Sequence, residues 1–268
     1  MQLQIFDVEH GACALLTCDN HTRLMIDCGH NSTTGWRPGT YLEQQNISTL
    51  EMLAITNYDE DHVSGIANLR DNVDVRWLLR NTSVSGAAIR NLKSEDGMGA
   101  GIERLVYEIE NVFTGDGGID PLPNFSGLEW QAFWNEPSTF DDENNLSMVV
   151  HLKCHGVGVM LPGDLEREGW LELLKRYAFQ QALRDTSVLV ASHHGRESGC
   201  CREIFNYCHP FYVVISDRGY LYDTQRTIPF YRSVAQGGPF RDEVRRVLTT
   251  RRDGRIGFTF DPNDWGPY

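Results

Sequence analysis

Four short loops rich in Asp, His and Asn each follow directly on an apolar, strand-like run of the sequence. They lie at residues 27–30, 57–62, 163–164 and 192–195. Because a sheet fixes the ends of its strands, loops that follow those strands hold their side chains rigidly and bring them together. Carboxylates and imidazoles are ordinary protein ligands of divalent metals. The pattern therefore predicts a sheet protein with a metal site at the ends of its strands.

Each loop taken alone also has a purely structural explanation. The residues around Asp27 would form a turn, and the acidic residues around Asp59 would form a solvated loop. Asp164 would cap a following helix, because its carboxylate can accept hydrogen bonds from the unpaired N–H groups there. The joint pattern favours the metal site, since all four loops lie at strand ends and the chain has almost no other loop rich in Asp and His.

Apolar periodicity predicts the regular elements. The expected strands span residues 2–8, 13–18, 23–27, 51–56, 75–79, 128–133, 147–152, 156–161, 187–191, 211–216 and 256–260. The expected helices span residues 38–45, 102–112, 165–178 and 239–248. Strands in clusters with helices between them favour two sheets packed together and helices outside them.

The order of these elements predicts one domain over residues 1–268. Within it, a flap or insertion is expected at about residues 81–126, where two glycine-rich, weakly apolar patches surround a helical segment. With 41% hydrophobic residues, a chain of this length can bury a full core.

The charge of the chain restricts its partners. Its formal net charge is −13. A protein that binds nucleic acid without specificity normally displays excess Lys and Arg, so the charge argues against a broad DNA-binding surface. It argues less strongly against phosphodiester chemistry, because divalent ions can reverse the sign of an acidic cleft.

The apolar runs are strand-length, far below the roughly 20 residues that cross a bilayer. No basic flank followed by a long apolar run marks a signal peptide. We therefore expect a soluble, cytoplasmic protein without membrane contact, and the sequence makes no prediction of its oligomeric state.

The ordered set of motifs resembles the metallo-β-lactamase superfamily, and within it the hydrolase domain of the competence protein ComEC and its free-standing relatives. The matching segments are residues 6–11, 25–29, 57–62, 144–147, 161–164, 192–195, 213–216 and 249–257. This resemblance covers most of the chain. It implies an α/β (α+β) fold, an αββα sandwich of two mixed β-sheets with helices on the outer faces, together with bound divalent metal and nuclease activity.

The metal loop departs from the pattern of that superfamily, HxHxDH, in which the leading histidines bind one ion and the Asp-His end binds the other. Asp61 and His62 keep the second half, whereas Asn57 and Asp59 stand at the leading positions. Oxygen donors in place of imidazoles shift the preference from zinc toward manganese or magnesium. The resemblance therefore implies one or two ions, Mn²⁺ or Zn²⁺ first and Mg²⁺ as the alternative, with the first site filled less well.

The remaining candidate residues come from the other loops. The resemblance implies that Asp164 bridges two ions and that one histidine of the pair 193–194 completes the second site. We expect His193 to be the ligand and His194 to contact phosphate or act as a general acid, and the reverse assignment also fits the sequence. Asp27 would orient a ligand through a hydrogen bond. His30 would be a substitute ligand or a proton donor.

Two functions follow from these residues. The first is a metal-dependent phosphodiesterase or nuclease that acts on nucleic acid or a nucleotide through a metal-activated hydroxide, with Asp61, Asp164 and His194 as catalytic residues. Single-stranded DNA, RNA and a small cyclic nucleotide all fit, whereas a β-lactam does not, because the all-histidine first site is absent. The second is a catalytically impaired pseudoenzyme, a binding or regulatory module with a protein partner.

Overall fold

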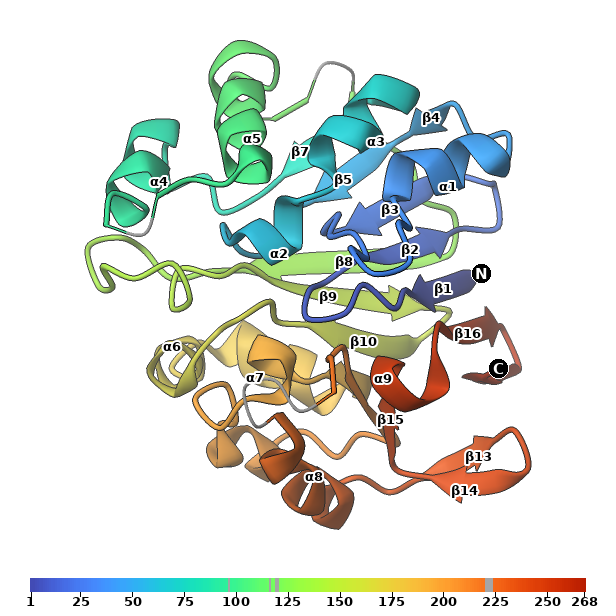
Figure 1. Cartoon of the computed structure of the whole chain (residues 1–268). Helices are drawn as coiled ribbons and strands as arrows, with labels where there is room; N and C mark the ends of the chain where they lie inside the picture. The colour runs from blue at the N-terminus through green and yellow to red at the C-terminus, as the bar shows by residue number, and fades with distance from the viewer. Residues whose placement is uncertain (96, 116, 119–120, 220–223) are drawn as a thin grey trace.

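The computed structural model describes residues 1–95, 97–115, 117–118, 121–219 and 224–268. Two β-sheets lie face to face between outer layers of helices (Figure 1). The αββα sandwich of two mixed sheets that the sequence predicts is confirmed.

The first sheet joins the start of the chain to its end, in the order β17-β16-β1-β2-β3-β5-β7. β1, β2 and β3 pair antiparallel, and β3, β5 and β7 pair parallel. Its strands are β1 (Gln2–Ile5), β2 (Ala14–Thr17), β3 (Arg23–Ile26), β5 (Met52–Ala54), β7 (Leu78–Leu79), β16 (Ile256–Asp261) and β17 (Asp264–Pro267). Since β3 and β5 are parallel neighbours, the loops that follow them meet at one edge of the sheet.

The second sheet has the order β15-β12-β11-β10-β9-β8. β8, β9 and β10 pair antiparallel, and β10, β11, β12 and β15 pair parallel. Its strands are β8 (Leu128–Phe133), β9 (Val149–Cys154), β10 (Val157–Leu161), β11 (Thr186–Val190), β12 (Tyr212–Ile215) and β15 (Val247–Thr249). The loops after β10 and β11 therefore also meet at one edge.

Helices cover the outer faces, α1 to α5 on the side of the first sheet and α6 to α8 on the side of the second (Figure 1). The helices are α1 (Pro38–Gln44), α2 (Glu60–Val63), α3 (Ile66–Asn72), α4 (Gly86–Leu92), α5 (Ala100–Asn111), α6 (Arg167–Leu173), α7 (Tyr177–Arg184), α8 (Ile228–Val234) and α9 (Thr250–Asp253). Short 3-10 turns are η1 (Ser192–Gly195), η2 (Arg202–Asn206) and η3 (Thr224–Thr227). Two small pairs complete the fold, β4 (Thr49–Leu50) with β6 (Asp74–Val75) and β13 (Gly238–Phe240) with β14 (Glu243–Arg245).

Alternating side chains along the strands build the layers. On β3, Leu24 and Ile26 enter the core between the sheets, whereas Met25 packs toward the helices of the first side. On β11, Val188 faces the other sheet and Leu189 faces the helices of the second side. This period of two buries both faces of central strands such as β3 and β11, which explains why these strands read as nearly continuous apolar runs.

The helix expected at residues 239–248 is wrong. The segment forms the hairpin β13–β14 and then enters β15. Phe240, Val244, Val247 and Leu248 fit a helical spacing, but Val244 is 74% exposed because it lies on the outer side of the hairpin. Arg241, with a φ of 53°, turns the chain between the two strands.

The helix expected at residues 165–178 is interrupted. It forms α6 and α7, separated where Arg176 adopts an extended conformation. Trp170 and Phe179 lie nine residues apart, so on one straight helix they would point in directions about 180° apart. The break lets both pack against the second sheet. The strand expected at 75–79 likewise divides into β6 and β7, which belong to different sheets.

Residues 81–126, the expected flap or insertion, contain α4 and α5, and residues 96, 116, 119 and 120 of this segment lie outside the described residues. Ile102, Leu105 and Val106 of α5 are buried in the apolar cluster that also holds α2 and α3. Among the described residues, no helix combines the length and the apolar character needed to cross a membrane.

Candidate metal centre

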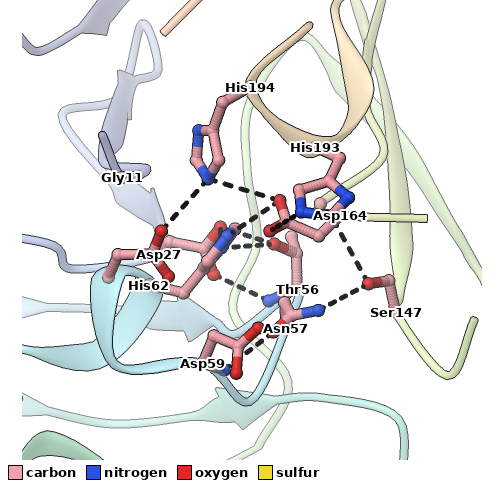
Figure 2. Close-up of polar contacts among 12 residues, drawn as sticks. Gly11, Asp27, Thr56, Asn57, Asp59, His62, Ser147, Asp164, His193 and His194 are labelled. Carbon is pink, nitrogen blue, oxygen red and sulfur yellow. Dashed lines mark hydrogen bonds and ion pairs between the residues drawn. The ribbon is translucent and has the colours of Figure 1, made fainter. Parts of the chain in front are cut away.

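Side chains from polar loops that follow strands of both sheets converge, as Figure 2 shows. Within the described residues, Asp61, His62, Asp164 and His194 form a group whose candidate ligand atoms all lie within 4.8 Å of one another. His62 comes from the start of α2 after β5, and His194 comes from η1 after β11. The two sheets thus each contribute half of the group.

The spacing of these atoms fits one tetrahedral ion. His62 Nε2 lies 3.0 Å from Asp164 Oδ1, and His194 Nε2 lies 3.4 Å from Asp164 Oδ1 and 3.4 Å from Asp61 Oδ2. For metal–ligand bonds of about 2.0–2.2 Å, tetrahedral geometry separates neighbouring ligand atoms by about 3.4 Å. The residues present therefore fit a divalent metal.

The burial of the group is a second observation that favours a metal site. His62, Asp164 and His194 are buried, and the nearest polar atoms to His194 Nε2 are carboxylate oxygens of Asp61 and Asp164, both at the long distance of 3.4 Å. Buried polar atoms in folded proteins are normally well hydrogen-bonded, so this loose arrangement favours a bound ion between them. Beside the group lies a cavity of about 40 Å³ lined in part by His62, Asp164 and His194. This space suits an ion or a water rather than a substrate.

The charges within the group are strongly coupled. Burial by itself lowers the pKa of His62, but Asp164 and Asp27 outweigh it and raise the pKa well above the ordinary value. The pKa of His194 is also raised, because Asp164 and Asp61 outweigh its burial. In return, the charges of His194 and His62 outweigh the burial of Asp164 and hold its pKa well below the ordinary value. A divalent ion would replace these protons as the counter-charge.

Asp27 orients His62. Its Oδ2 accepts a hydrogen bond of 2.9 Å from His62 Nδ1, so Nε2 faces Asp164. Its Oδ1 accepts a hydrogen bond of 2.7 Å from the backbone N–H of Thr56. Asp27 has a φ of 56°, a left-handed conformation that is uncommon outside glycine and often marks functional sites. The hydrogen bond from His62 to Asp27 is of the kind that the sequence analysis expected, in which Asp27 orients a candidate metal ligand.

Close backbone packing holds the loop of Asp61. A Cβ added to Gly11 would lie 2.6 Å from the Asp61 carbonyl oxygen, and one added to Gly29 would lie 2.4 Å from it. Both glycines therefore let two turns approach the metal loop closely. Cys28 N–H donates to the His62 carbonyl at 2.8 Å, which ties the turn after β3 to this loop.

Comparison with solved structures identifies the architecture. The metallo-β-lactamase fold protein YhfI from Bacillus subtilis matches with a TM-score of 0.50 and 11% identity, over 96% of this chain and 100% of that chain. A mutant of the CmlA β-hydroxylase matches with a TM-score of 0.54 and 13% identity, over 95% of this chain and 53% of that chain. The chain has the metallo-β-lactamase fold.

The comparison of sequences agrees with the ComEC-like resemblance of the motifs. ComE operon protein 3 of Bacillus subtilis (strain 168) is 25% identical over 223 residues, which make up 82% of this chain and 26% of that protein. The chain therefore spans about a quarter of the length of this relative. No family model matches the chain.

Within this metallo-β-lactamase fold, His194 rather than His193 lies in the candidate metal group, which is the second of the two assignments that the sequence allowed. His194 belongs to the candidate metal group, and its Nδ1 donates to the Ser216 carbonyl oxygen at 3.1 Å, which leaves Nε2 facing the carboxylates. His193 Nε2 lies 3.8 Å from Asp164 and only 2.9 Å from Arg196 Nη1. Both histidines are left-handed, with φ of 50° and 52°, so their side chains leave the loop in different directions.

The other predicted residues lie outside the group. Asn57 is buried in a hydrogen-bond network, and Asp59 forms an ion pair with Lys93. His30 Nδ1 pairs with Ser64 Oγ at 2.7 Å, and burial lowers its pKa. None of the three belongs to the group of candidate ligands found in the described part of the chain.

Sequence reasoning missed Arg196. Its guanidinium lies between two imidazoles, with Nη1 2.9 Å from His193 Nε2 and Nη2 3.0 Å from His10 Nε2. Burial lowers the pKa of His10 to about 3, and the charge of the nearby His194 adds to this effect. His10 is therefore neutral at pH 7 and can accept the hydrogen bond. The available signal was the position of Arg196 directly after the His-His-Gly motif.

Proposed function

We propose that the chain is a metal-dependent hydrolase that cleaves phosphodiesters, with nucleic acid or a nucleotide as substrate. The observation that carries this proposal is the convergence of Asp61, His62, Asp164 and His194, in which the buried His194 Nε2 faces two carboxylates at 3.4 Å. These four residues would hold the ion, and two imidazoles with two carboxylates suit Mn²⁺ and Zn²⁺ better than Mg²⁺. A bound ion would act as a Lewis acid and generate the nucleophile from water at neutral pH.

Asp61 is the member of the group that reaches solvent. Its side chain is 29% exposed, whereas those of His194 and Asp164 are 3% and 4% exposed. Burial alone would raise the pKa of Asp61, but His194 and His62 outweigh it and lower the pKa. The ionised Asp61 can accept a hydrogen bond from the attacking water and orient it toward the substrate.

Arg196 offers the site a positive charge in a chain of net charge −13. His193 has a pKa lowered by burial, so like His10 it is an uncharged acceptor that holds the guanidinium in place. A planar guanidinium with several donors matches phosphate oxygens. We assign Arg196 and His193 to contact with the phosphate, the role that the sequence analysis gave to His194.

The test measures metal content and the hydrolysis of bis(p-nitrophenyl) phosphate by the full chain with Mn²⁺, Zn²⁺ or Mg²⁺. We expect the wild type to bind metal and to hydrolyse the diester. His194→Ala should lose both properties, and His209→Ala, at an exposed histidine, should keep them. A His194→Ala variant with wild-type metal binding and activity would contradict the proposed centre.

The second candidate is a metal-binding module without catalysis. It is favoured by Asn57 and Asp59, which are held by protein contacts at the two leading positions of the metal loop. A wild type that binds metal tightly but cleaves neither the generic diester, nor single-stranded DNA, RNA or a cyclic nucleotide, would support this candidate over the hydrolase.

A further inference from the structure

The two leading positions of the metal loop are already occupied by contacts within the protein. Asn57 is fully buried. Its Oδ1 accepts a hydrogen bond of 2.7 Å from the Asp59 backbone N–H, and its Nδ2 donates to Ser147 Oγ at 3.0 Å. In addition, Nδ2 lies 3.2 Å from the acceptor Asn144 Oδ1. An ion that took Asn57 as a ligand would have to displace part of this network.

Asp59 is neutralised by a lysine. Lys93, which directly follows α4, reaches the metal loop and forms ion pairs with Asp59 and, at 2.6 Å, with Glu143. Its side chain is only 5% exposed. Burial alone lowers the pKa of Lys93, but the hydrogen bonds to both carboxylates outweigh it and raise the pKa. A permanent ammonium therefore lies between two carboxylates beside the leading half of the motif.

On the basis of the proposed metal centre, we infer that the Lys93 ammonium takes the place of the first metal ion, so that the centre holds a single divalent ion. An ion entering the first site would have to separate Lys93 from Asp59 and Glu143. Separating a largely buried ammonium from its carboxylates leaves its charge uncompensated, which is strongly unfavourable. The remaining group of Asp61, His62, Asp164 and His194 offers four donors, enough to hold one ion without the first site, and expansion to five ligands would leave a position for water.

A network of hydrogen bonds connects Lys93 with the metal centre. Lys93 pairs with Asp59, whose backbone N–H donates to Asn57, and Asn57 donates to Ser147 Oγ. Ser147 Oγ in turn accepts a hydrogen bond of 3.2 Å from the Asp164 backbone N–H. Lys93 is thus linked through hydrogen bonds to the backbone of Asp164 in the remaining site. A chelator, which removes a metal ion, cannot remove this covalently attached positive charge.

The experiment counts ions per folded chain. The full chain is stripped with a chelator, saturated with Mn²⁺ or Zn²⁺, and analysed by native mass spectrometry and by electron paramagnetic resonance of the Mn²⁺ form. We expect one ion in the wild type and the spectrum of an isolated Mn²⁺ ion. Lys93→Met frees the carboxylates of Asp59 and Glu143 and should raise the count to two, with the spectrum of a coupled ion pair.

Two further variants serve as controls. Lys153→Met removes a lysine that pairs with Asp185 at 3.3 Å on the surface, and it should leave the count at one. Lys93→Arg keeps the positive charge and should also bind one ion, so it tests the inference if Lys93→Met does not fold.

The outcomes separate this inference from the proposed function. Two ions in the wild type, in Lys93→Arg, or in both would overturn the role of Lys93 and leave the metal-dependent hydrolase intact. A folded Lys93→Met that still binds one ion would also overturn it. A wild type that binds no ion would overturn the metal centre itself, and the inference with it.

Discussion

Replacing Asp164 with Asn tests the centre with almost no change of shape. The carboxylate is 4% exposed, and its Oδ1 lies 3.0 Å from His62 Nε2 and 3.4 Å from His194 Nε2. The amide keeps an oxygen acceptor but loses the negative charge that both imidazoles share. Helix capping, the structural role that the sequence also allowed, does not apply, because the N-cap of α6 is Glu166.

The expected effect has two parts. In the metal-free protein, a hydrogen bond to a charged group worth about 1.5–3 kcal/mol becomes a neutral one worth about 0.5–1.5 kcal/mol. The free energy of unfolding should therefore fall by about 1 kcal/mol, or about 2–4 °C in Tm for a chain of this size. Loss of a supporting residue already weakens metal binding about 10–100-fold, so loss of a direct ligand should cost at least about 100-fold, or about 2.8 kcal/mol.

Both parts are measurable on the same samples. Thermal unfolding in excess chelator gives the first, and isothermal titration with Mn²⁺ and Zn²⁺ gives the second. Asp185→Asn is the matched control, because it removes the charge of a half-exposed carboxylate that pairs with Lys153 on the surface. If Asp164→Asn bound metal as tightly as the wild type and hydrolysed the diester at the same rate, Asp164 would not be a ligand and the centre would be wrong.

Four further predictions concern the surroundings of the ion. Metal affinity should rise with pH through the neutral range, because the raised pKa values of His62 and His194 keep both imidazoles protonated in the metal-free protein and binding must release these protons. Calorimetric titration in buffers of different ionisation enthalpy would detect the released protons. A metal affinity that does not change with pH would contradict this prediction. The raised pKa values also stabilise the metal-free fold below the unfolded pKa of about 6.5, and this stability should be lost as pH rises through the folded values, as seen by chemical denaturation in chelator. Asp27→Asn should weaken metal binding about 10–100-fold by releasing His62 from its orientation, and unchanged binding would exclude that role. Arg196→Gln should raise KM for the diester about 10–100-fold, the equivalent of one hydrogen bond to a charged group, with partial recovery in Arg196→Lys; a change in kcat alone would argue against phosphate contact.

The sequence was sufficient to predict three residues of the candidate metal group because they lie in short continuous motifs. Asp61, His62 and Asp164 each follow a strand whose apolar run is easily recognised, and strand ends on parallel neighbours meet at one edge. Which of His193 and His194 joins the candidate metal group could not be predicted from the sequence. Adjacent residues differ in direction according to backbone dihedral angles, and here both residues adopt a left-handed conformation that no sequence pattern indicates.

Contacts between segments that are distant in the chain could not be predicted from the sequence for a different reason. Lys93 lies 34 residues from Asp59 and 50 residues from Glu143 in the chain. The amino-acid sequence around Lys93 resembles that of an ordinary exposed helix end. Nothing local distinguishes it from other lysines. The same limit explains the hairpin at β13–β14, where the spacing of Phe240 and Val244 fits a helix and only the packing of Phe240 against the sandwich decides otherwise.

The division of the metal group between the sheets has a mechanical consequence. Asp61 and His62 follow a strand of the first sheet, whereas Asp164 and His194 follow strands of the second. An ion bound by all four would act as a reversible cross-link between two halves of the molecule, joining residues 102 positions apart in the case of His62 and Asp164. At an ion concentration of about 100 times Kd, binding confined to the folded state adds about 2.7 kcal/mol to its stability. In a cell that withholds the metal, the halves would separate more often and proteases would reach the open chain sooner. The supply of metal would then affect how long the protein survives in the cell.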